Sequence, residues 1–112
     1  MTGAIVLLCT CCSEKEGRLL AEALVESKLA ACVNLLPGVH SIYRWEGEVE
    51  KAAEVLLLIK STADRFDDLR ARITELHSYD TPEIIALPIV AGSDRYLDWI
   101  RRETVAADKS VE

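Results

Sequence analysis

The sequence predicts an α+β fold of the ferredoxin-like type, in which a βαββαβ order is followed by one further helix. Aliphatic runs typical of strands alternate with amphipathic segments typical of helices, in the order strand, helix, strand, strand, helix, strand. The chain has 112 residues, of which 50% are hydrophobic. This length and composition predict a single domain over 1–112 whose core forms without disulfides or structural metals.

The first strand and helix are predicted from residues 4–28. Residues 4–9 are continuously aliphatic and end in a cysteine-rich corner, which is typical of a strand buried on both faces. Ser13 predicts a helix start, because its side chain can cap the first turn while Glu16 reaches back to complete a capping box. Apolar residues recur on one face of this helix, which is expected to end near Lys28.

A long bent hairpin is predicted next. Residues 31–46 are extended, apart from Pro37 and Gly38, which predict a kink or bulge because proline lacks a backbone donor. Gly47 can take the positive φ of a tight hairpin turn. The returning strand contains the unbroken aliphatic run 55–59.

The second helix is predicted to begin at Ser61 or Thr62, either of which could act as its cap, with Asp64 in the first turn. Apolar residues then recur at steps of three and four until the helix ends near His77.

The chain is predicted to finish with a strand at 84–90, a short helix that follows residues 92–94 and contains residues 96–100, and a flexible polar tail at about 104–112. The aliphatic strands do not alternate apolar with polar residues, as strands with one wet face should. Two helices can cover only one face of the sheet. We therefore expect the other face to be buried against copies of the same chain.

Charge and apolar runs limit the partners and the compartment. The net charge is −6 and no basic run occurs, which argues against nucleic acid as a partner and is compatible with divalent cations. No apolar run approaches the roughly 18 residues that a membrane span needs, and the first apolar run is too short for a secretion signal. The sequence therefore predicts a cytoplasmic protein that has no membrane partner.

The four cysteines are expected to be free thiols in a reducing compartment; they are Cys9, Cys11, Cys12 and Cys32. Cys9 and Cys12 have the C-x-x-C spacing at a strand-to-helix corner, where helix dipoles lower thiol pKa values and soft metals bind. Alternatively, Cys9 is a small buried apolar residue. Cys32 is predicted to lie in the core.

A second candidate site is the loop 77–83, which brings together an imidazole, a phenol and carboxylates. These groups suit zinc, copper or manganese, although a helix-end cap and a solvated turn would use the same residues.

The hairpin contains acidic and aromatic residues. Its acidic residues predict a solvated edge that discourages strand pairing, with a weak site for divalent cations as the alternative; they are Glu46, Glu48, Glu50 and Glu54. Tyr43 and Trp45 share one strand face and could line a pocket or fill an interface. The chain has no phosphate-binding glycine loop, no H-E-x-x-H and no nucleophile elbow, so we predict that it is not an enzyme.

Several short motifs occur in a specific order between residues 4 and 102. They are Ala30-Ala31-Cys32-Val33-Asn34, Leu36-Pro37-Gly38, Ser41-Ile42-Tyr43, Trp45-Glu46-Gly47, His77-Ser78-Tyr79, Thr81-Pro82-Glu83-Ile84 and Tyr96-Leu97-Asp98-Trp99-Ile100. Together they resemble the CutA divalent-cation tolerance family. The resemblance implies a homotrimer similar to the PII signalling proteins, tolerance to copper and other divalent metals, and no required cofactor or established reaction.

The resemblance also implies metal ligands. Cys9 matches the cysteine of the family's Leu-Cys-Thr strand, and His77 and Glu83 match the two ends of its H-P-Y-x-x-P-E segment, which lies near subunit boundaries. The predicted ligands are therefore His77, Glu83 and Cys9. Ser78 replaces the usual proline, which is expected to loosen this loop.

Three functional hypotheses follow. The first is a cytosolic trimer that weakly binds Cu(II) or other divalent cations near its subunit interfaces. The second is a PII-like signalling or scaffold trimer whose clefts bind a small ligand or a protein without metal. The third is a Cu(I) carrier or redox module that uses Cys9 and Cys12.

Overall fold

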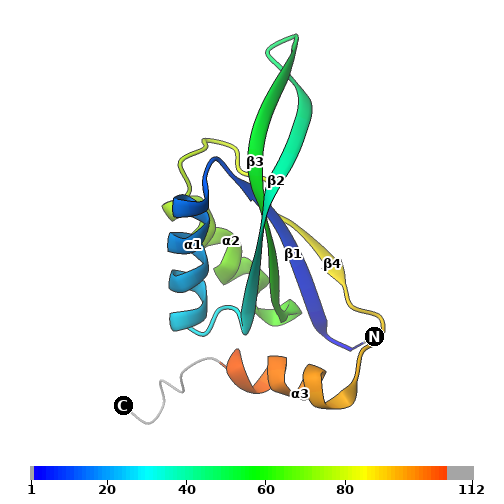
Figure 1. Ribbon diagram of the computed structural model, residues 1–112. Coiled ribbons are helices and arrows are strands. Elements are labelled where there is room, and N and C mark those ends of the chain that lie inside the picture. Colours follow the sequence, from blue (N-terminus) through cyan, green and yellow to red (C-terminus); the bar gives the residue numbers. More distant parts are fainter. Residues whose placement is uncertain (1, 106–112) are drawn as a thin grey trace.

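The computed structural model describes residues 2–105 and confirms the predicted element order (Figure 1). The elements are β1 (Ala4–Cys11), α1 (Glu14–Glu26), β2 (Cys32–Trp45), β3 (Glu48–Thr62), the short 3-10 turn η1 (Ala63–Arg65), α2 (Phe66–Leu76), β4 (Ile85–Pro88) and α3 (Asp94–Glu103).

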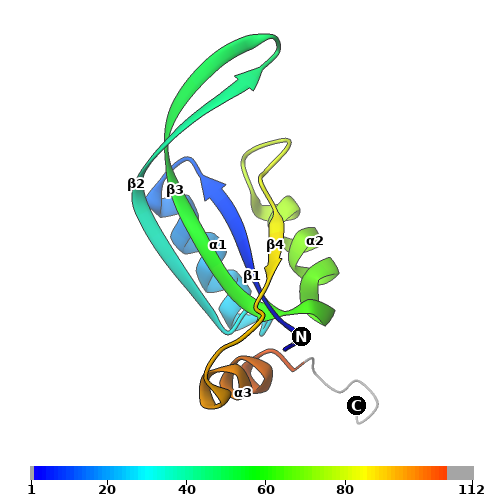
Figure 2. The same ribbon diagram turned by 90° about the vertical axis from the view of Figure 1, so that its right-hand side faces the viewer.

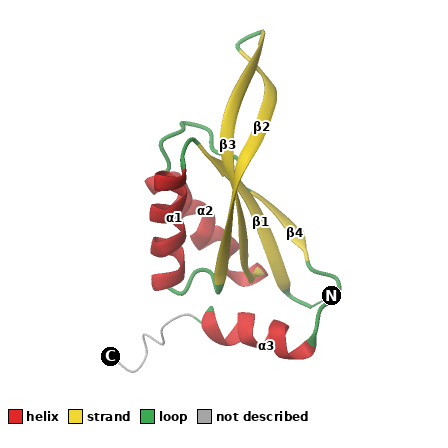
Figure 3. Cartoon of the chain, viewed as in Figure 1, coloured by secondary structure: helices red, strands yellow, loops and turns green. Residues whose placement is uncertain are grey.

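The strands form an antiparallel sheet in the order β2-β3-β1-β4. Helices α1 and α2 lie together on one face of it, and α3 crosses the end of the sheet near the N-terminus (Figure 3). Within residues 2–105, no helix is long and apolar enough to cross a membrane.

The core lies between the sheet and the two helices that cover it. Leu57 and Ile59 of β3 are fully buried and pack with Leu24 of α1 and Ile73 of α2. Each such side chain contributes roughly 1.5–3 kcal/mol by leaving water.

Helix α1 packs closely on the sheet because Gly17 lacks a side chain. A Cβ at this position would lie 3.1 Å from Leu35 Cδ2 and 3.3 Å from Leu57 Cδ2. The close approach fixes the helix against β2 and β3, next to the corner where β1 meets α1.

The predicted bulge and turn of the hairpin are confirmed. The β2–β3 register shifts between Leu36 and Val39, and Gly38 has a φ of 80°. At the tip, Glu46 and Gly47 have φ values of 49° and 82°. Positive φ at both central residues matches the right-handed strand twist, as in a type I′ turn. Figure 2 shows the hairpin bending beyond the helices, and the longest dimension of the chain is 50 Å.

The N-terminus of α1 confirms half of the predicted capping box. Ser13 Oγ accepts a hydrogen bond from the backbone amide of Glu16 at 3.1 Å. The reciprocal half is wrong, because the Glu16 carboxylate accepts from the amide of Cys12 at 3.3 Å and from that of Ser78 at 2.9 Å. Glu16 therefore links the start of α1 to the loop after α2.

Neither of the residues predicted to cap the second helix does so. The Ser61 hydroxyl is buried and donates to the carbonyl of Leu29 at 2.6 Å. The Thr62 hydroxyl donates to the Asp64 carboxylate at 2.5 Å rather than accepting from a helix amide. The turn η1 then leads into α2, which begins at Phe66.

The last strand is shorter than predicted, the last helix is longer than predicted, and most of the predicted tail lies outside the described residues. The predicted strand 84–90 is reduced to Ile85–Pro88, although the amide of Ile89 still donates to the carbonyl of Ala4 at 3.0 Å. Thr104 was predicted to begin the flexible tail, and the prediction is wrong for this residue: it is buried, and its hydroxyl donates to the carbonyl of Ile100 at 2.8 Å. Of the predicted tail, residues 106–112 lie outside the described part.

The sheet face opposite α1 and α2 is apolar and only partly covered. Leu8 pairs with Ile85 on one side and Leu58 on the other, and Val6 pairs with Leu87. Ile85 is 50% exposed and Leu87 47% exposed. Within one chain the strands are therefore buried on the helix-covered face only, and burial of the other face against copies of the chain stays a prediction.

Candidate metal centre and adjacent cleft

Strand β1 places two thiols on the helix-covered face of the sheet. Alternate residues of a strand share a face, so Cys9 and Cys11 point inward while Thr10 points to the other side. Both cysteine side chains are fully buried. Cys9 and Cys11 thus form a C-x-C pair on the buried face of the strand.

The end of α2 brings an imidazole to these thiols. His77 is the last residue hydrogen-bonded to the helix, through its amide to the carbonyl of Ile73 at 2.8 Å. Its Nδ1 accepts from the amide of Tyr79 at 3.0 Å, and its Nε2 lies 2.8 Å from the carbonyl oxygen of Thr10. Because Nδ1 accepts, Nε2 holds the proton and donates to Thr10. The ring is therefore neutral and is bonded at both nitrogens.

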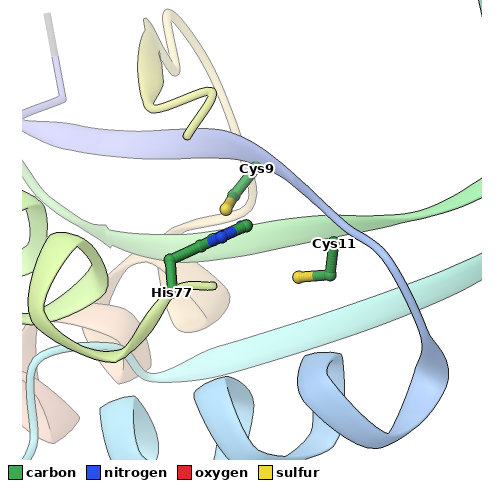
Figure 4. A group of neighbouring side chains, drawn as sticks. All are labelled: Cys9, Cys11 and His77. Carbon is green, nitrogen blue, oxygen red and sulfur yellow. The ribbon is translucent and has the colours of Figure 1, made fainter. Parts of the chain in front are cut away.

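Cys9, Cys11 and His77 form one cluster, in which the candidate ligand atoms all lie within 4.8 Å of one another. Figure 4 shows both thiol groups projecting from β1 toward the imidazole ring. Two sulfurs and one imidazole nitrogen suit zinc and copper rather than calcium or magnesium. The donor set is therefore chemically suited to a soft or borderline cation.

Protonation and hydrogen bonding oppose metal binding in this cluster. The hydrogen bond with Cys9, and then burial, hold the pKa of the Cys11 thiol far above its ordinary value. A metal would displace thiol protons, because thiolates are the ligand form. It would also replace one of the two ring hydrogen bonds of His77, each of which contributes about 1 kcal/mol.

The structure brings together only two of the three predicted ligands. Cys9 and His77 lie together, but Glu83 is exposed, does not belong to the cluster and lines a neighbouring cleft. Cys11 was missed as a ligand by the sequence reasoning. The signal that could have identified it is its i+2 spacing from Cys9 within a strand, which places both thiols on one face.

Cys9 and Cys12, the C-x-x-C pair of the third hypothesis, do not share a buried face as Cys9 and Cys11 do. Cys9 is buried, whereas Cys12 is exposed in the turn after β1, and its Sγ lies 4.0 Å from Ser13 Oγ. Cys32, predicted to lie in the core, is half-buried at the start of β2.

A cleft of about 550 Å³ lies beside the hairpin. It is lined by Thr10, Ser41, Ile42, Tyr43, Trp45, Glu54, Tyr79, Asp80, Thr81 and Glu83. Of the two alternatives for Tyr43 and Trp45, a pocket or an interface, the single chain therefore places both residues along a pocket.

Glu54 does not belong to a solvated acidic edge, so that prediction is wrong for this residue. It is only 8% exposed, and its Oε2 accepts a hydrogen bond from the Tyr79 hydroxyl at 2.8 Å. Burial and the neighbouring Glu54 raise the pKa of Tyr79 well above its ordinary value. Tyr79 therefore stays a neutral donor to a buried carboxylate.

Glu16 supports the loop that contains His77 and Tyr79. Partial burial alone would raise the pKa of Glu16, but hydrogen bonds from Ser78 and from the amide of Cys12 outweigh it and lower the pKa. The bonds favour the ionised form. A charged carboxylate therefore holds the β1–α1 corner and the loop after α2 together.

Comparison with known proteins agrees with the architecture and the ordered motifs. The family described as CutA1 divalent ion tolerance protein matches residues 5–103. The chain belongs to the CutA1 family. A CutA1 relative from Thermus thermophilus, named divalent-cation tolerance protein CutA, is 54% identical over 99 residues, which cover 88% of this chain and 96% of the relative.

Other CutA1 relatives differ in length. The chloroplastic protein CutA of Arabidopsis thaliana is 45% identical over 101 residues, which cover 90% of this chain but only 56% of that protein. A solved CutA1 structure from Thermus thermophilus superposes with a TM-score of 0.90 at 52% identity and covers 91% of this chain and 99% of that one. The family description names tolerance to divalent ions and no reaction.

Proposed function

We propose that this CutA1-family protein contributes to divalent-cation tolerance by binding a cation such as Cu²⁺ or Zn²⁺ at the cluster of Cys9, Cys11 and His77. The observation that supports this most directly is the approach of three ligand atoms to within 4.8 Å of one another. Zinc sites with two cysteines and one histidine keep a fourth position open for water. No cofactor is required in this proposal.

Binding at this cluster is reversible and weaker than in a preformed structural site. The imidazole must exchange one of its bonds, to Thr10 or to Tyr79, for the metal. Both thiols are fully buried, so the surrounding segments must open for a cation to enter. Reversible uptake suits a protein that lowers the concentration of free cations without retaining them permanently.

We also propose that the protein works as a homotrimer in the cytoplasm. The apolar sheet face that contains Leu8, Leu58 and Leu87 favours association, because exposed apolar patches of this kind mark interfaces. The exposed Glu83 would then lie near a subunit boundary, where it could act as a further ligand. Sedimentation equilibrium should give three chain masses, and a monomer at micromolar concentration would contradict the trimer.

Cation binding is tested by titrating the metal-free protein with Zn²⁺ and with Cu²⁺ in a calorimeter. We expect Cys9→Ser and His77→Gln to weaken binding at least tenfold, and Cys11→Ser to weaken it for Zn²⁺. Cys12→Ser is the matched control, because this cysteine is exposed and outside the cluster. Equal affinities for the wild type and the three cluster variants would refute the site. Circular dichroism verifies that each variant is folded.

A second candidate function is supported by the cleft rather than by the thiols. A signalling or scaffold trimer that binds a small ligand needs a concave site, and cavities of about 300–1,000 Å³ are typical of such sites. The cleft volume of about 550 Å³ lies within this range.

A further inference from the structure

We infer that the cleft beside the hairpin binds a small organic cation, of the alkylammonium or alkyldiammonium class. The inference goes beyond cation tolerance and does not depend on Cys9 or His77. It gives a ligand chemistry to the second candidate function.

The charge of the cleft is entirely negative. Its lining contains the carboxylates of Glu54, Asp80 and Glu83 and no lysine, arginine or histidine. A site of this composition repels anions and attracts cations, because the field of like charges adds in a concave wall.

Glu54 gives the cleft a buried charge that lacks a counter-ion. The residue is more than nine-tenths buried, and Tyr79 donates a neutral hydrogen bond to its Oε2. Within residues 2–105, no basic side chain forms an ion pair with Glu54. A buried carboxylate is costly unless it is paired. A bound ammonium group supplies both the missing charge and further hydrogen-bond donors.

The aromatic walls favour an organic cation over a hydrated metal ion. Tyr43 and Trp45 from β2 and Tyr79 from the loop line the same cleft as the carboxylates. Ammonium groups are attracted to aromatic faces, and the alkyl chain of the ligand gains by burying apolar surface there. Trp45 is 52% exposed and Tyr43 44% exposed, so both have surface available to such a ligand.

The distribution of the carboxylates suits a ligand with two charged ends. Glu54 is buried, whereas Asp80 and Glu83 are exposed. One ammonium group can therefore bind the inner carboxylate while the second remains near the outer pair, with the alkyl chain against the aromatic side chains. The available volume of about 550 Å³ accommodates a diamine of this kind.

The test is calorimetric titration of the full chain with 1,4-diaminobutane, with neutral 1,4-butanediol as the control ligand. Glu54→Gln removes the charge but keeps an oxygen that can accept from Tyr79. Glu26→Gln makes the same charge change at an exposed position on α1, away from the cleft. Trp45→Leu changes an exposed side chain and tests the aromatic contribution without altering the charge.

We expect the diamine to bind the wild type and Glu26→Gln with equal affinity. Its binding to Glu54→Gln should be at least tenfold weaker, and its binding to Trp45→Leu should also be weaker. The diol should not bind any of these proteins. The proposal is overturned if the wild-type protein, in whatever oligomeric state it adopts, does not bind the diamine. This result would be expected if another copy of the chain occupied the cleft. The proposal is also overturned if Glu26→Gln weakens binding as much as Glu54→Gln, which would indicate a general charge effect.

The result is separable from that for the metal site. Cys9→Ser should bind the diamine normally, and Glu54→Gln should bind Zn²⁺ normally. Loss of diamine binding in Cys9→Ser would contradict the independence of the two sites.

Discussion

The Glu16 carboxylate accepts a hydrogen bond from the backbone amide of Ser78 at 2.9 Å, across 62 residues of sequence. Its other oxygen accepts from the amide of Cys12. One side chain on α1 thus fixes the end of β1 and the loop that contains His77 and Tyr79. This contact therefore joins two segments that border the cluster of Cys9, Cys11 and His77 and the adjacent cleft, although Glu16 belongs to neither.

Glu16→Gln should reduce the free energy of unfolding at pH 7 by about 1 kcal/mol, because two charge-assisted hydrogen bonds at a partly exposed site become weaker neutral ones. The native pKa of Glu16 lies below its ordinary value of 4.5, so its stabilisation is present above pH 4.5 and is lost as the pH falls toward the native pKa. Urea unfolding across this range should show less acid sensitivity in the variant. Glu26→Gln is the control; an identical acid profile for Glu16→Gln and wild type would contradict the role.

Lys28→Gly should stabilise the chain by about 0.5–1 kcal/mol. Lys28 has a φ of 63°, in the region where side chains are strained, and it follows α1 at a position where glycine is usual. The amides of Lys28 and Leu29 donate to the carbonyls of Val25 and Leu24, which completes a Schellman motif. Thermal unfolding measures the gain. Lys15→Gly, within α1, should instead destabilise, and a loss of stability in Lys28→Gly would be inconsistent with relief of strain.

Gly17→Val should lower the free energy of unfolding by roughly 2 kcal/mol, because the new side chain would overlap Leu35 and Leu57. Valine has a higher helix propensity than glycine, so any loss reports packing against the sheet. Glu22→Val introduces the same side chain at an exposed site of α1 and serves as the control. Denaturant unfolding of both variants compares their free energies of unfolding. Equal values would contradict the close approach of α1 to the sheet at Gly17.

Leu87→Lys should weaken association of the chains without unfolding them. Leu87 is 47% exposed on the open face of the sheet, beside Val6, so a charge there would be buried in an interface formed by that face. Sedimentation velocity at several concentrations should show a lower apparent mass than for the wild type. Leu19→Lys places the same charge on α1, where Leu19 is 62% exposed, and should leave association unchanged. Equal apparent masses for the wild type and both variants would show that the open sheet face is not the interface.

The fold was largely predictable because its signals are local. Aliphatic runs defined the strands, Gly38 and Gly47 marked the bulge and the tip, and Ser13 marked the start of α1. The cap predicted at Ser61 failed for a non-local reason: the side chain lies in the interior and bonds to Leu29, 32 residues away.

The candidate site was predicted only in part because it depends on contacts between distant segments. Periodicity places Cys9 and Cys11 on one strand face, but it cannot bring His77 to them across the fold. The burial of Glu54 likewise depends on Tyr79, 25 residues later, and nothing in the run of glutamates distinguishes it from its exposed neighbours.

The hairpin extends well beyond the layer of helices, and two paired strands without such a layer are only marginally stable in water. Its tip is therefore the part of the sheet whose order depends most on neighbouring molecules. Backbone amides near Trp45 should exchange with deuterium much faster than those of β1 in a solitary chain. If exchange of these amides slows when the chains associate, the exchange rate at the hairpin tip will report assembly directly. It will also report any ligand that binds against Tyr43 and Trp45.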